Sequence, residues 1–338
     1  MIPDLPETLP SGFRTATDRF RVLKESGFEL VMLGRSEAGR SIPAVRMGRG
    51  PRRASLVAGA HADEPVGPET LIVLVASAAA SPDRYAPLLD EWTLLVAPQI
   101  NPDGEAANRS WIDAWPSLSS YLTGARREAP GRDIEFGYPD LRQENQAVAA
   151  AMAGMAPLDL HMSLHGMGFS DGAMLLIDRF WSFRSGMLRE AFSQAAAAEG
   201  LLLHDHNRKG EKGFFQIEPG FTTTPEGAAM RAFFEARGEP GTAALFRDSS
   251  MEYARSLGGD PLCVVTELPL FLVEGKRRPG VPEGYLAFRD LKPRLIRRLE
   301  EGEAEEAVLA NLPVKPLALA AAVRLQWRAI GSALRLAG

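Results

Sequence analysis

The chain has 338 residues, of which 45% are hydrophobic and 24% are charged, and its formal net charge is −5. This globular composition suits one large α/β domain or two smaller ones, and the acidic balance argues against a phosphate-binding surface, so we expect no nucleic-acid partner. The single cysteine, Cys263, excludes an intramolecular disulfide and a thiolate metal cluster.

The two ends of the chain carry no pattern typical of export or membrane insertion. The first ten residues lack a basic region followed by an apolar one, so we expect a cytoplasmic protein. The most apolar stretch, 317–336, is interrupted by Arg324, Arg328 and Arg335, and we therefore expect no membrane partner. The spacing of these arginines predicts one polar stripe along an amphipathic helix. Nothing in the sequence indicates an oligomeric state.

Strand-like and helix-like patterns alternate along most of the chain. In chain order they predict a helix at 15–26, strands at 28–33, 42–47 and 54–60, a helix that begins at Pro65 and runs to 76, a strand at 92–98, a helix at 141–155, strands at 157–164 and 173–177, helices at 182–199 and 225–237, a strand at 261–268, and helices from 299 onward. Residues 105–138 and 204–224 are predicted to be irregular.

This alternation predicts an α/β fold with a mixed, largely parallel central sheet and helices on both faces. No internal repeat or low-complexity segment divides the chain. We therefore expect one catalytic domain over residues 1–298, followed by a C-terminal helical extension at 299–338.

A candidate metal site lies where the predicted strand at 54–60 ends. His61 and Glu64 are three residues apart at the carboxyl end of this strand, where open α/β sheets place their chemistry. An imidazole and a carboxylate at this spacing can bind one zinc ion, with a third ligand from elsewhere. His165 is the better candidate because it ends a second strand just before a glycine, whereas His161, on the same face, would lie deeper as a core histidine. The pair His204 and His206 is typical of a solvated loop.

Glu267 is the candidate general base. It lies within an otherwise apolar predicted strand, where a carboxylate is costly unless it is paired or functional. Beside a zinc ion, such a carboxylate can take the proton of a metal-activated water molecule.

Taken together, these motifs resemble the zinc metallocarboxypeptidase family, the carboxypeptidase A-like enzymes and their bacterial amidase relatives. His61-x-x-Glu64 is similar to the first two zinc ligands, Ser163-Leu-His165-Gly to the segment with the third, and Thr266-Glu-Leu to the segment with the catalytic glutamate. Asn101-Pro-Asp-Gly followed by Arg109 resembles the turn that leads to the arginine which polarises the scissile carbonyl. The motifs occur in family order over residues 30–270. The resemblance implies a fold of the same type, one zinc ion per chain, a peptide or small amide substrate, and Asn101 at the substrate site.

The chain departs from the family at one motif. The family usually carries Asp-x-Asn-Arg, whose asparagine and arginine hold the terminal carboxylate of the substrate, and the corresponding run here is Asp133-Ile-Glu135-Phe136. The resemblance implies that Asp133 orients His61. Glu135 at the substrate site would repel a free carboxylate, so we expect amides or amino-bearing peptides to be better substrates. Arg247, with Arg132, is the candidate for a displaced carboxylate contact.

Two alternatives to a zinc hydrolase stay open. Gly168-Phe-Ser170-Asp-Gly fits the nucleophile elbow of serine hydrolases, with His206 as a possible base. That motif needs a helix directly after the serine, and the following residues favour a strand. The second alternative is a non-catalytic binding protein on the same scaffold, which we would expect to lack a ligand or the base.

Overall fold

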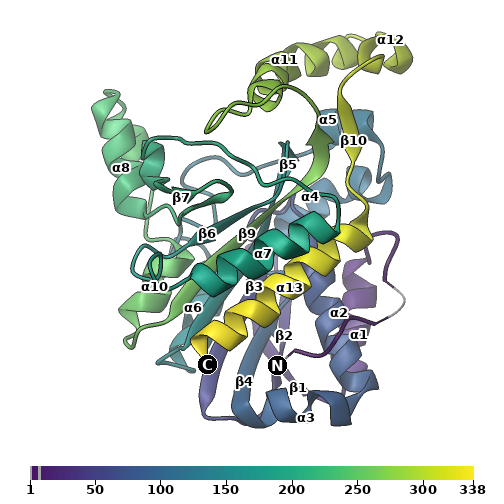
Figure 1. Ribbon diagram of the computed structural model, residues 1–338. Coiled ribbons are helices and arrows are strands. Elements are labelled where there is room, and N and C mark those ends of the chain that lie inside the picture. Colours follow the sequence, from purple (N-terminus) through teal and green to yellow (C-terminus); the bar gives the residue numbers. More distant parts are fainter. Residues whose placement is uncertain (1, 7–8) are drawn as a thin grey trace.

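The computed structural model describes residues 2–6 and 9–338, and its centre is a mixed ten-stranded sheet with helices on both faces (Figure 1). The strand order is β1-β2-β4-β3-β5-β9-β6-β8-β7, and β10 pairs with β9. The four neighbouring strands β4, β3, β5 and β9 run parallel, while most other pairings are antiparallel. This confirms the predicted fold class.

The elements have the following bounds. The strands are β1 (Glu29–Arg35), β2 (Ser41–Met47), β3 (Arg52–Ala58), β4 (Trp92–Ala97), β5 (Leu160–Ser170), β6 (Met174–Ile177), β7 (Gln216–Glu218), β8 (Phe221–Thr223), β9 (Leu262–Val273) and β10 (Val314–Pro316). The helices are α1 (Ala16–Glu25), α2 (Val66–Ala80), α3 (Pro82–Glu91), α4 (Pro102–Asp113), α5 (Leu118–Gly124), α6 (Gln143–Ala153), α7 (Gly186–Ala198), α8 (Gly227–Ala236), α9 (Pro240–Ala243), α10 (Ser250–Ser256), α11 (Glu283–Glu300), α12 (Glu305–Leu309) and α13 (Leu319–Ala337), with a 3₁₀ turn η1 at Glu211–Gly213.

Side chains of the central strands alternate between two apolar layers. Leu56 and Leu164 lie in one layer, which packs against α2, α7 and α13. Val57 and Val265 lie in the other, which packs against α6 and α10. Parallel strands are normally buried on both faces in this way, and the arrangement explains why their sequences are almost continuously apolar.

The clearest difference from the sequence-based expectation is at residues 102–124. This stretch was expected to be a turn and an irregular loop, and it forms α4 and α5. Asn101 caps α4, because its side-chain oxygen accepts a hydrogen bond from the backbone nitrogen of Gly104 at 3.0 Å. Pro102 occupies the first helical position, where proline is tolerated. The Asn-Pro-Asp-Gly run thus begins a helix instead of a turn.

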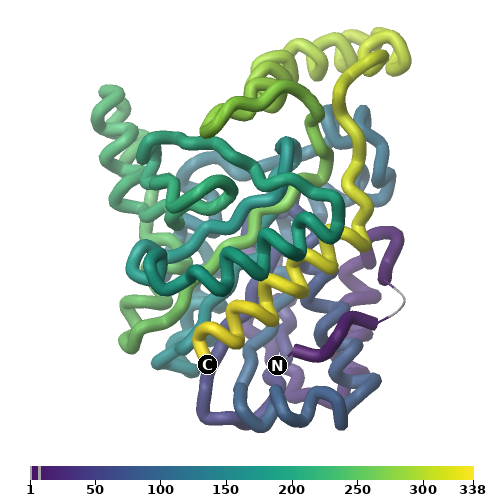
Figure 2. The backbone as a smooth tube through the Cα atoms, in the orientation of Figure 1, coloured from purple at the N-terminus to yellow at the C-terminus, as the bar shows by residue number. Residues whose placement is uncertain are grey.

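The C-terminal helix α13 is part of the main core. Trp327 and Ile330 are fully buried, and α13 lies beside α7 in front of the sheet (Figure 1). Trp327 also donates a hydrogen bond from its indole nitrogen to the carbonyl of Pro3 at 3.0 Å, so the N-terminal segment runs along this helix (Figure 2). The expected domain boundary at residue 298 falls inside α11, and residues 319–337 share the core of the preceding chain.

One buried glutamine of α13 joins the two central strands. The side-chain nitrogen of Gln326 donates to the carbonyl of His165 at 3.2 Å and to the hydroxyl of Thr266 at 3.0 Å. Its oxygen accepts from the hydroxyl of Thr70 at 2.6 Å. Gln326 therefore connects α2, β5 and β9 next to His165.

We expect Gln326→Leu to lower the free energy of unfolding by about 2 kcal/mol. Three buried hydrogen bonds are lost, while the size of the side chain stays similar. Urea unfolding monitored by circular dichroism measures this change. Gln194→Leu, at an exposed position of α7, is the matched control and should change the free energy by less than about 0.5 kcal/mol. Equal effects of the two substitutions would contradict the bracing role of Gln326.

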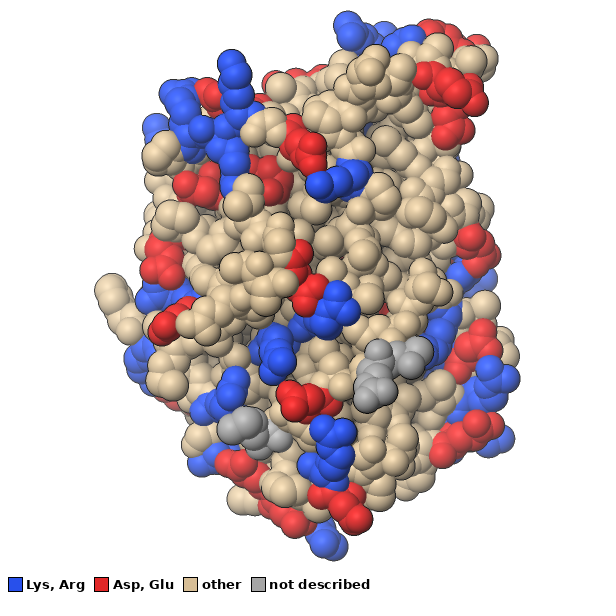
Figure 3. Space-filling view, turned by 45° about the vertical axis from the view of Figure 1, so that its right-hand side comes forward, with Lys and Arg blue, Asp and Glu red and all other residues tan. Residues whose placement is uncertain are grey.

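The surface shows no field of one sign on the face seen in Figure 3, where acidic and basic side chains are interspersed. Among the described residues, no helix is both long and apolar enough to cross a membrane.

Candidate metal centre

Two adjacent strands bring the three candidate ligands together. β3 and β5 are parallel neighbours with Ala58 opposite Leu164. The residues that come after Ala58 in one chain segment and after Leu164 in the other therefore lie close together at one edge of the sheet. His61 and Glu64 lie in the turn between β3 and α2, which is closed by a hydrogen bond from the backbone nitrogen of Glu64 to the carbonyl of His61 at 3.2 Å. His165 lies on β5 itself and is 3% exposed.

The donor atoms of His61, Glu64 and His165 converge on one point. The Nδ1 atoms of the two rings are 2.9 Å apart, and the two Glu64 oxygens lie 3.1 Å from His61 Nδ1 and 2.9 Å from His165 Nδ1. Ligands of one tetrahedral zinc ion, with bonds near 2.0–2.1 Å, are separated by about 3.3 Å. The three side chains therefore fit zinc, and among the described residues they form the group that can hold a metal.

A carboxylate lies beside the outer nitrogen of each ring. His61 Nε2 lies 3.3 Å from Asp133 Oδ1, and His165 Nε2 lies 3.1 Å from Glu135 Oε2. Such contacts hold Nε2 as the protonated nitrogen and leave Nδ1 to face a metal. Asp133 thus lies where the family resemblance places it.

The charge balance of these residues favours a bound cation. Burial and the neighbouring His61 favour the neutral ring of His165, but the carboxylates of Glu64 and Glu135 outweigh them and raise its pKa to about 9. The carboxylates thus favour the protonated, positively charged form of the imidazole rings. A zinc ion would supply that charge in place of protons, as is usual when metal binding displaces protons from its ligands.

Glu135, expected at the substrate site, has partners within the fold for both of its carboxylate oxygens. Its Oε1 accepts hydrogen bonds from the backbone nitrogen of Ser250 at 3.1 Å and from the Ser250 hydroxyl at 2.6 Å. Its Oε2 accepts from Ser163 at 3.3 Å and faces His165. With both oxygens hydrogen-bonded, Glu135 positions His165 while its carboxylate remains in the wall of a pocket beside the centre.

Glu267 lies directly across the strand pair from the third ligand. β5 and β9 are parallel with His165 opposite Glu267, and Oε2 of Glu267 is buried without a hydrogen-bond partner in the described part of the chain. Burial and the nearby Glu64 carboxylate raise the pKa of Glu267 to about 8. A carboxyl group with a raised pKa and a vacant acceptor atom is suited to proton transfer.

His161 lies deeper on the same strand, as expected for a core histidine. It is fully buried, neither ring nitrogen has a partner among the described residues, and burial lowers its pKa to about 4. His161 is therefore a neutral ring outside the converging group of donors.

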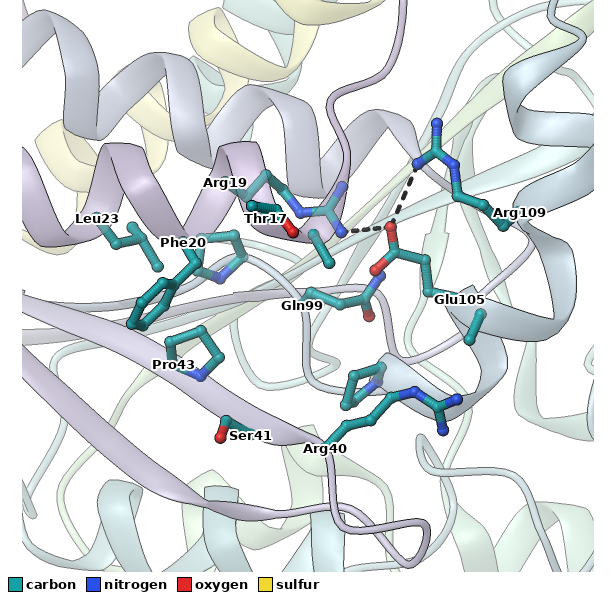
Figure 4. A pocket seen from close by; sticks show the side chains of 14 residues that line it. Thr17, Arg19, Phe20, Leu23, Arg40, Ser41, Pro43, Gln99, Glu105 and Arg109 are labelled. Atoms are coloured by element: carbon teal, nitrogen blue, oxygen red, sulfur yellow. Dashed lines mark hydrogen bonds and ion pairs between the residues drawn. The ribbon is translucent and has the colours of Figure 1, made fainter.

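Arg109, expected to polarise the substrate carbonyl, lies away from this centre. It sits two turns into α4, where its Nε donates to Asp113 at 2.8 Å and its Nη1 donates to the carbonyl of Arg14 at 3.1 Å. Figure 4 shows it beside Glu105 at a cavity of about 600 Å³ between α1 and α4, which contains none of the ligands. Because residues 102–113 are helical, the side chain is directed toward α1 instead of the sheet edge.

Arg127 is the arginine that the fold places at the centre. It follows α5 and binds both oxygens of Asp63, from Nε at 2.7 Å and from Nη2 at 3.1 Å, while Nη2 also contacts Glu64. Its side chain remains 41% exposed, so part of the guanidinium faces the cleft. Arg127 thus takes the position that the sequence comparison had given to Arg109.

Two other expected substrate residues have different places. Asn101 is fully buried, caps α4, and donates from its amide nitrogen to the carbonyl of Ala60 at 3.3 Å and to Glu128. It therefore holds the polypeptide next to His61 and Arg127 without lining the cleft. Arg247 is exposed and joins the fold through its backbone nitrogen, which donates to the carbonyl of Phe136 at 2.9 Å. Its side chain lines none of the cavities beside the centre.

The serine alternative lacks the required geometry. Ser170 is buried at the end of β5, its hydroxyl contacts the carbonyl of Gly172, and the next element is strand β6. His206, the possible base, packs instead against the rings of His204 and Tyr285. No nucleophile elbow forms at this position.

Two cavities meet at Glu267. The first, which we call the apolar pocket, has a volume of about 90 Å³ and is lined by His61, Glu135, Phe136, His165, Leu176, Phe214, Thr224, Pro225, Ser249, Met251, Val265 and Glu267. The second, which we call the cationic cleft, has a volume of about 380 Å³ and is lined by Asp63, Glu64, Tyr121, Arg127, Gly166, Met167, Gly168, Phe169, Glu267, Tyr285, Phe288, Arg289 and Lys292. The candidate metal centre thus lies between a pocket without lysine or arginine and a polar cleft with both.

Two imidazoles and a carboxylate around one point, beside a partnerless buried carboxyl group, define a mononuclear metal centre of the hydrolytic type on an α/β sheet. Residues 17–167, which include all three ligands, match the sequence pattern of the family described as zinc carboxypeptidase. Over this stretch the chain is similar to zinc carboxypeptidases, and zinc is the metal that the ligand set fits. No protein with curated annotation matches the sequence.

Solved structures show the same fold. A metallo-carboxypeptidase from Pseudomonas aeruginosa, in complex with (2-guanidinoethylmercapto)succinic acid, is 17% identical with a TM-score of 0.54, over 96% of this chain and 69% of that chain. The carboxypeptidase A from Helicoverpa armigera is 12% identical with a TM-score of 0.51, over 96% and 73%. The chain spans 59% of the length of a metallo-carboxypeptidase from Burkholderia cenocepacia.

Proposed function

We propose that the protein is a zinc-dependent hydrolase of peptide or amide bonds. The observation that carries this proposal is the position of the Glu267 carboxyl group, directly across one strand pair from His165 and beside the converging donors of His61 and Glu64. A protein that had lost its activity would be expected to have lost one of these four groups.

Each residue of the site has a separate role in the proposed reaction. His61, Glu64 and His165 would hold zinc, which supplies a Lewis acid and an acidified water molecule. Oε2 of Glu267 accepts a proton from the attacking water and then donates it to the leaving nitrogen. The exposed part of Arg127 faces the cleft and stabilises negative charge as it develops on the carbonyl oxygen. Asp133 and Glu135 keep the two rings oriented.

The apolar pocket supports a non-classical terminal specificity. It contains no lysine or arginine, and Phe136 stands where the family usually has an arginine. A free carboxylate in this pocket would lose its hydration without a cationic partner. The protein should therefore prefer a neutral group on this side of the scissile bond, because the pocket offers no lysine or arginine to a carboxylate.

We expect purified protein to contain about one zinc ion per chain and to hydrolyse a blocked dipeptide amide faster than the same dipeptide with a free carboxylate. Dialysis against a chelator should abolish both the metal and the hydrolysis, and added zinc should restore them. Metal analysis and chromatography of the products give the measurement. A zinc-loaded protein that cleaves neither compound nor other acyl-amino-acid amides would favour a binding function.

A further inference from the structure

We propose that helix α11 forms a subsite for a carboxylate carried by the acyl side of the substrate, on the far side of Glu267 from the apolar pocket. This inference rests on the proposed function and adds the class of substrate: amides whose acyl group bears an acidic function.

One face of α11 is directed at the candidate metal centre. Tyr285, Phe288, Arg289 and Lys292 line the cationic cleft together with Glu64 and Glu267. Their spacing of three, four and seven residues places them on one stripe of the helix. Phe288 is buried and also contacts Phe169 at a ring distance of 4.7 Å, which fixes the stripe against β5.

The two cations on this stripe lack strong partners. Lys292 is half-buried beside the ring of Phe169, and it has no ion-pair partner among residues 2–6 and 9–338. Burial lowers the pKa of its ammonium group. Among the described residues Arg289 forms one ion pair, with the adjacent Asp290 at 3.1 Å, and both side chains are exposed. A half-buried ammonium group without a counter-ion is costly, and a bound anion would offset that cost.

The acidic groups of the cleft already have partners elsewhere. Both oxygens of Asp63 bind Arg127, and Glu64 faces His61 and His165 as a ligand. These groups lie at the sheet edge, whereas Arg289 and Lys292 project from the helix opposite. Asp63 attracts Lys292 across the cleft, but it is itself paired with Arg127, so Lys292 has no carboxylate of its own. The cleft, of about 380 Å³, accommodates a short acyl chain.

A carboxylate is the anion that this geometry favours. Arginine and lysine side by side can bind its two oxygens through charge-assisted hydrogen bonds. Because Arg289 is largely exposed, solvent weakens its contribution, and we expect the pair to give about a tenfold preference for the acid. The contact is on the opposite side of Glu267 from the motif at 133–136, so it does not replace the missing clamp.

The test compares the binding of two compounds to the Glu267→Gln protein, in which hydrolysis is prevented. The probes are N-glutaryl-leucinamide and the same compound with its carboxylate converted to a carboxamide. Isothermal titration calorimetry should show about tenfold tighter binding of the acid at about 50 mM salt, and a smaller preference at about 500 mM. The preference should persist after zinc is removed, because neither cation is a metal ligand.

Substitutions on α11 assign the preference to the helix. Arg289→Gln together with Lys292→Gln should reduce the ratio of the two affinities to about one. Arg294→Gln, on the exposed opposite side of the same helix, is the matched control and should leave the ratio unchanged. An acid preference that survives the double substitution, or that disappears with the metal, would overturn the subsite. Acid preference without hydrolysis in the unsubstituted protein would instead overturn the proposed function alone.

Discussion

Glu267→Gln should lower kcat by about three orders of magnitude while leaving the zinc content at the level of the unsubstituted protein. The amide keeps the size of the side chain but cannot accept the proton of the attacking water, and general acid–base catalysis contributes about 10²–10⁴-fold. Zinc should stay bound because the three metal ligands are other side chains. The pairing of His165 with residue 267 is made by backbone atoms and does not depend on the substituted side chain. Steady-state kinetics on the best amide substrate, with metal analysis, measure both quantities.

Two further variants make this result specific. Glu274→Gln, just beyond the far end of β9, removes an exposed carboxylate that pairs with Lys315, and it should retain full activity. Ser170→Ala removes the hydroxyl of the alternative nucleophile and should also change little. An inactive serine variant beside an active Glu267→Gln protein would show that catalysis does not use the carboxylate.

His165→Ala should reduce the zinc content from about one ion per chain to nearly none after dialysis. The substitution removes one of three donors and leaves Glu135 without the ring that it orients, so the remaining two donors cannot hold the metal firmly. Metal analysis by mass spectrometry measures the loss, and activity should fall with it.

The matched control is His161→Leu, four residues earlier on the same strand. Its ring is equally buried, has no hydrogen-bond partner among the described residues and lies outside the group of donors, so zinc should be retained. Leucine fills most of the space, which limits the cost of a cavity. Loss of zinc from the His161 variant, with retention in His165→Ala, would mean that the other histidine is the ligand.

The sheet and the three ligands were accessible from the sequence because both depend on local patterns. Apolar runs at 54–60, 92–98 and 261–268 correspond to β3, β4 and β9, and the alternation with helices predicts the parallel core. His61 follows the end of β3, and His165, which was expected to end its strand, lies in the middle of β5 because the pairing with β9 continues to Ser170, so the positions of both follow from the strands. His61 and His165 could therefore be placed together without knowledge of any loop.

The remaining site residues depend on segments whose course the sequence does not specify. Arg109 was assigned by its distance from Asn101, but the intervening residues form α4 and turn the side chain away from the centre. Arg127 comes from the segment after α5, and only its contacts with Asp63 and Glu64 in the folded chain identify it. Glu135 was assigned by its alignment with a substrate contact, whereas its real partners, Ser163 and Ser250, are known only after folding.

The α11 stripe was missed for a different reason. The residues 283–300 are largely polar, and the sequence pattern was interpreted as helical only from 299. The spacing of Tyr285, Phe288, Arg289 and Lys292 indicates a helix face, but which face meets the cleft follows from packing against β5. Substrate-facing residues of this kind are the part of the site that a single sequence specifies least.

The backbone pairing between β5 and β9 has a consequence for protein engineering. Ten residue pairs from Leu160–Leu262 to Ser170–Leu272 set the relation between His165 and Glu267, and Gln326 braces that pairing from behind. The residues that face the cleft from α11, and Thr224 and Pro225, which face the apolar pocket from the chain before α10, are in segments that do not contribute to this pairing. Exchange of α11 or of the residues before α10 should therefore yield enzymes with new substrate ranges and an unchanged hydrolytic apparatus.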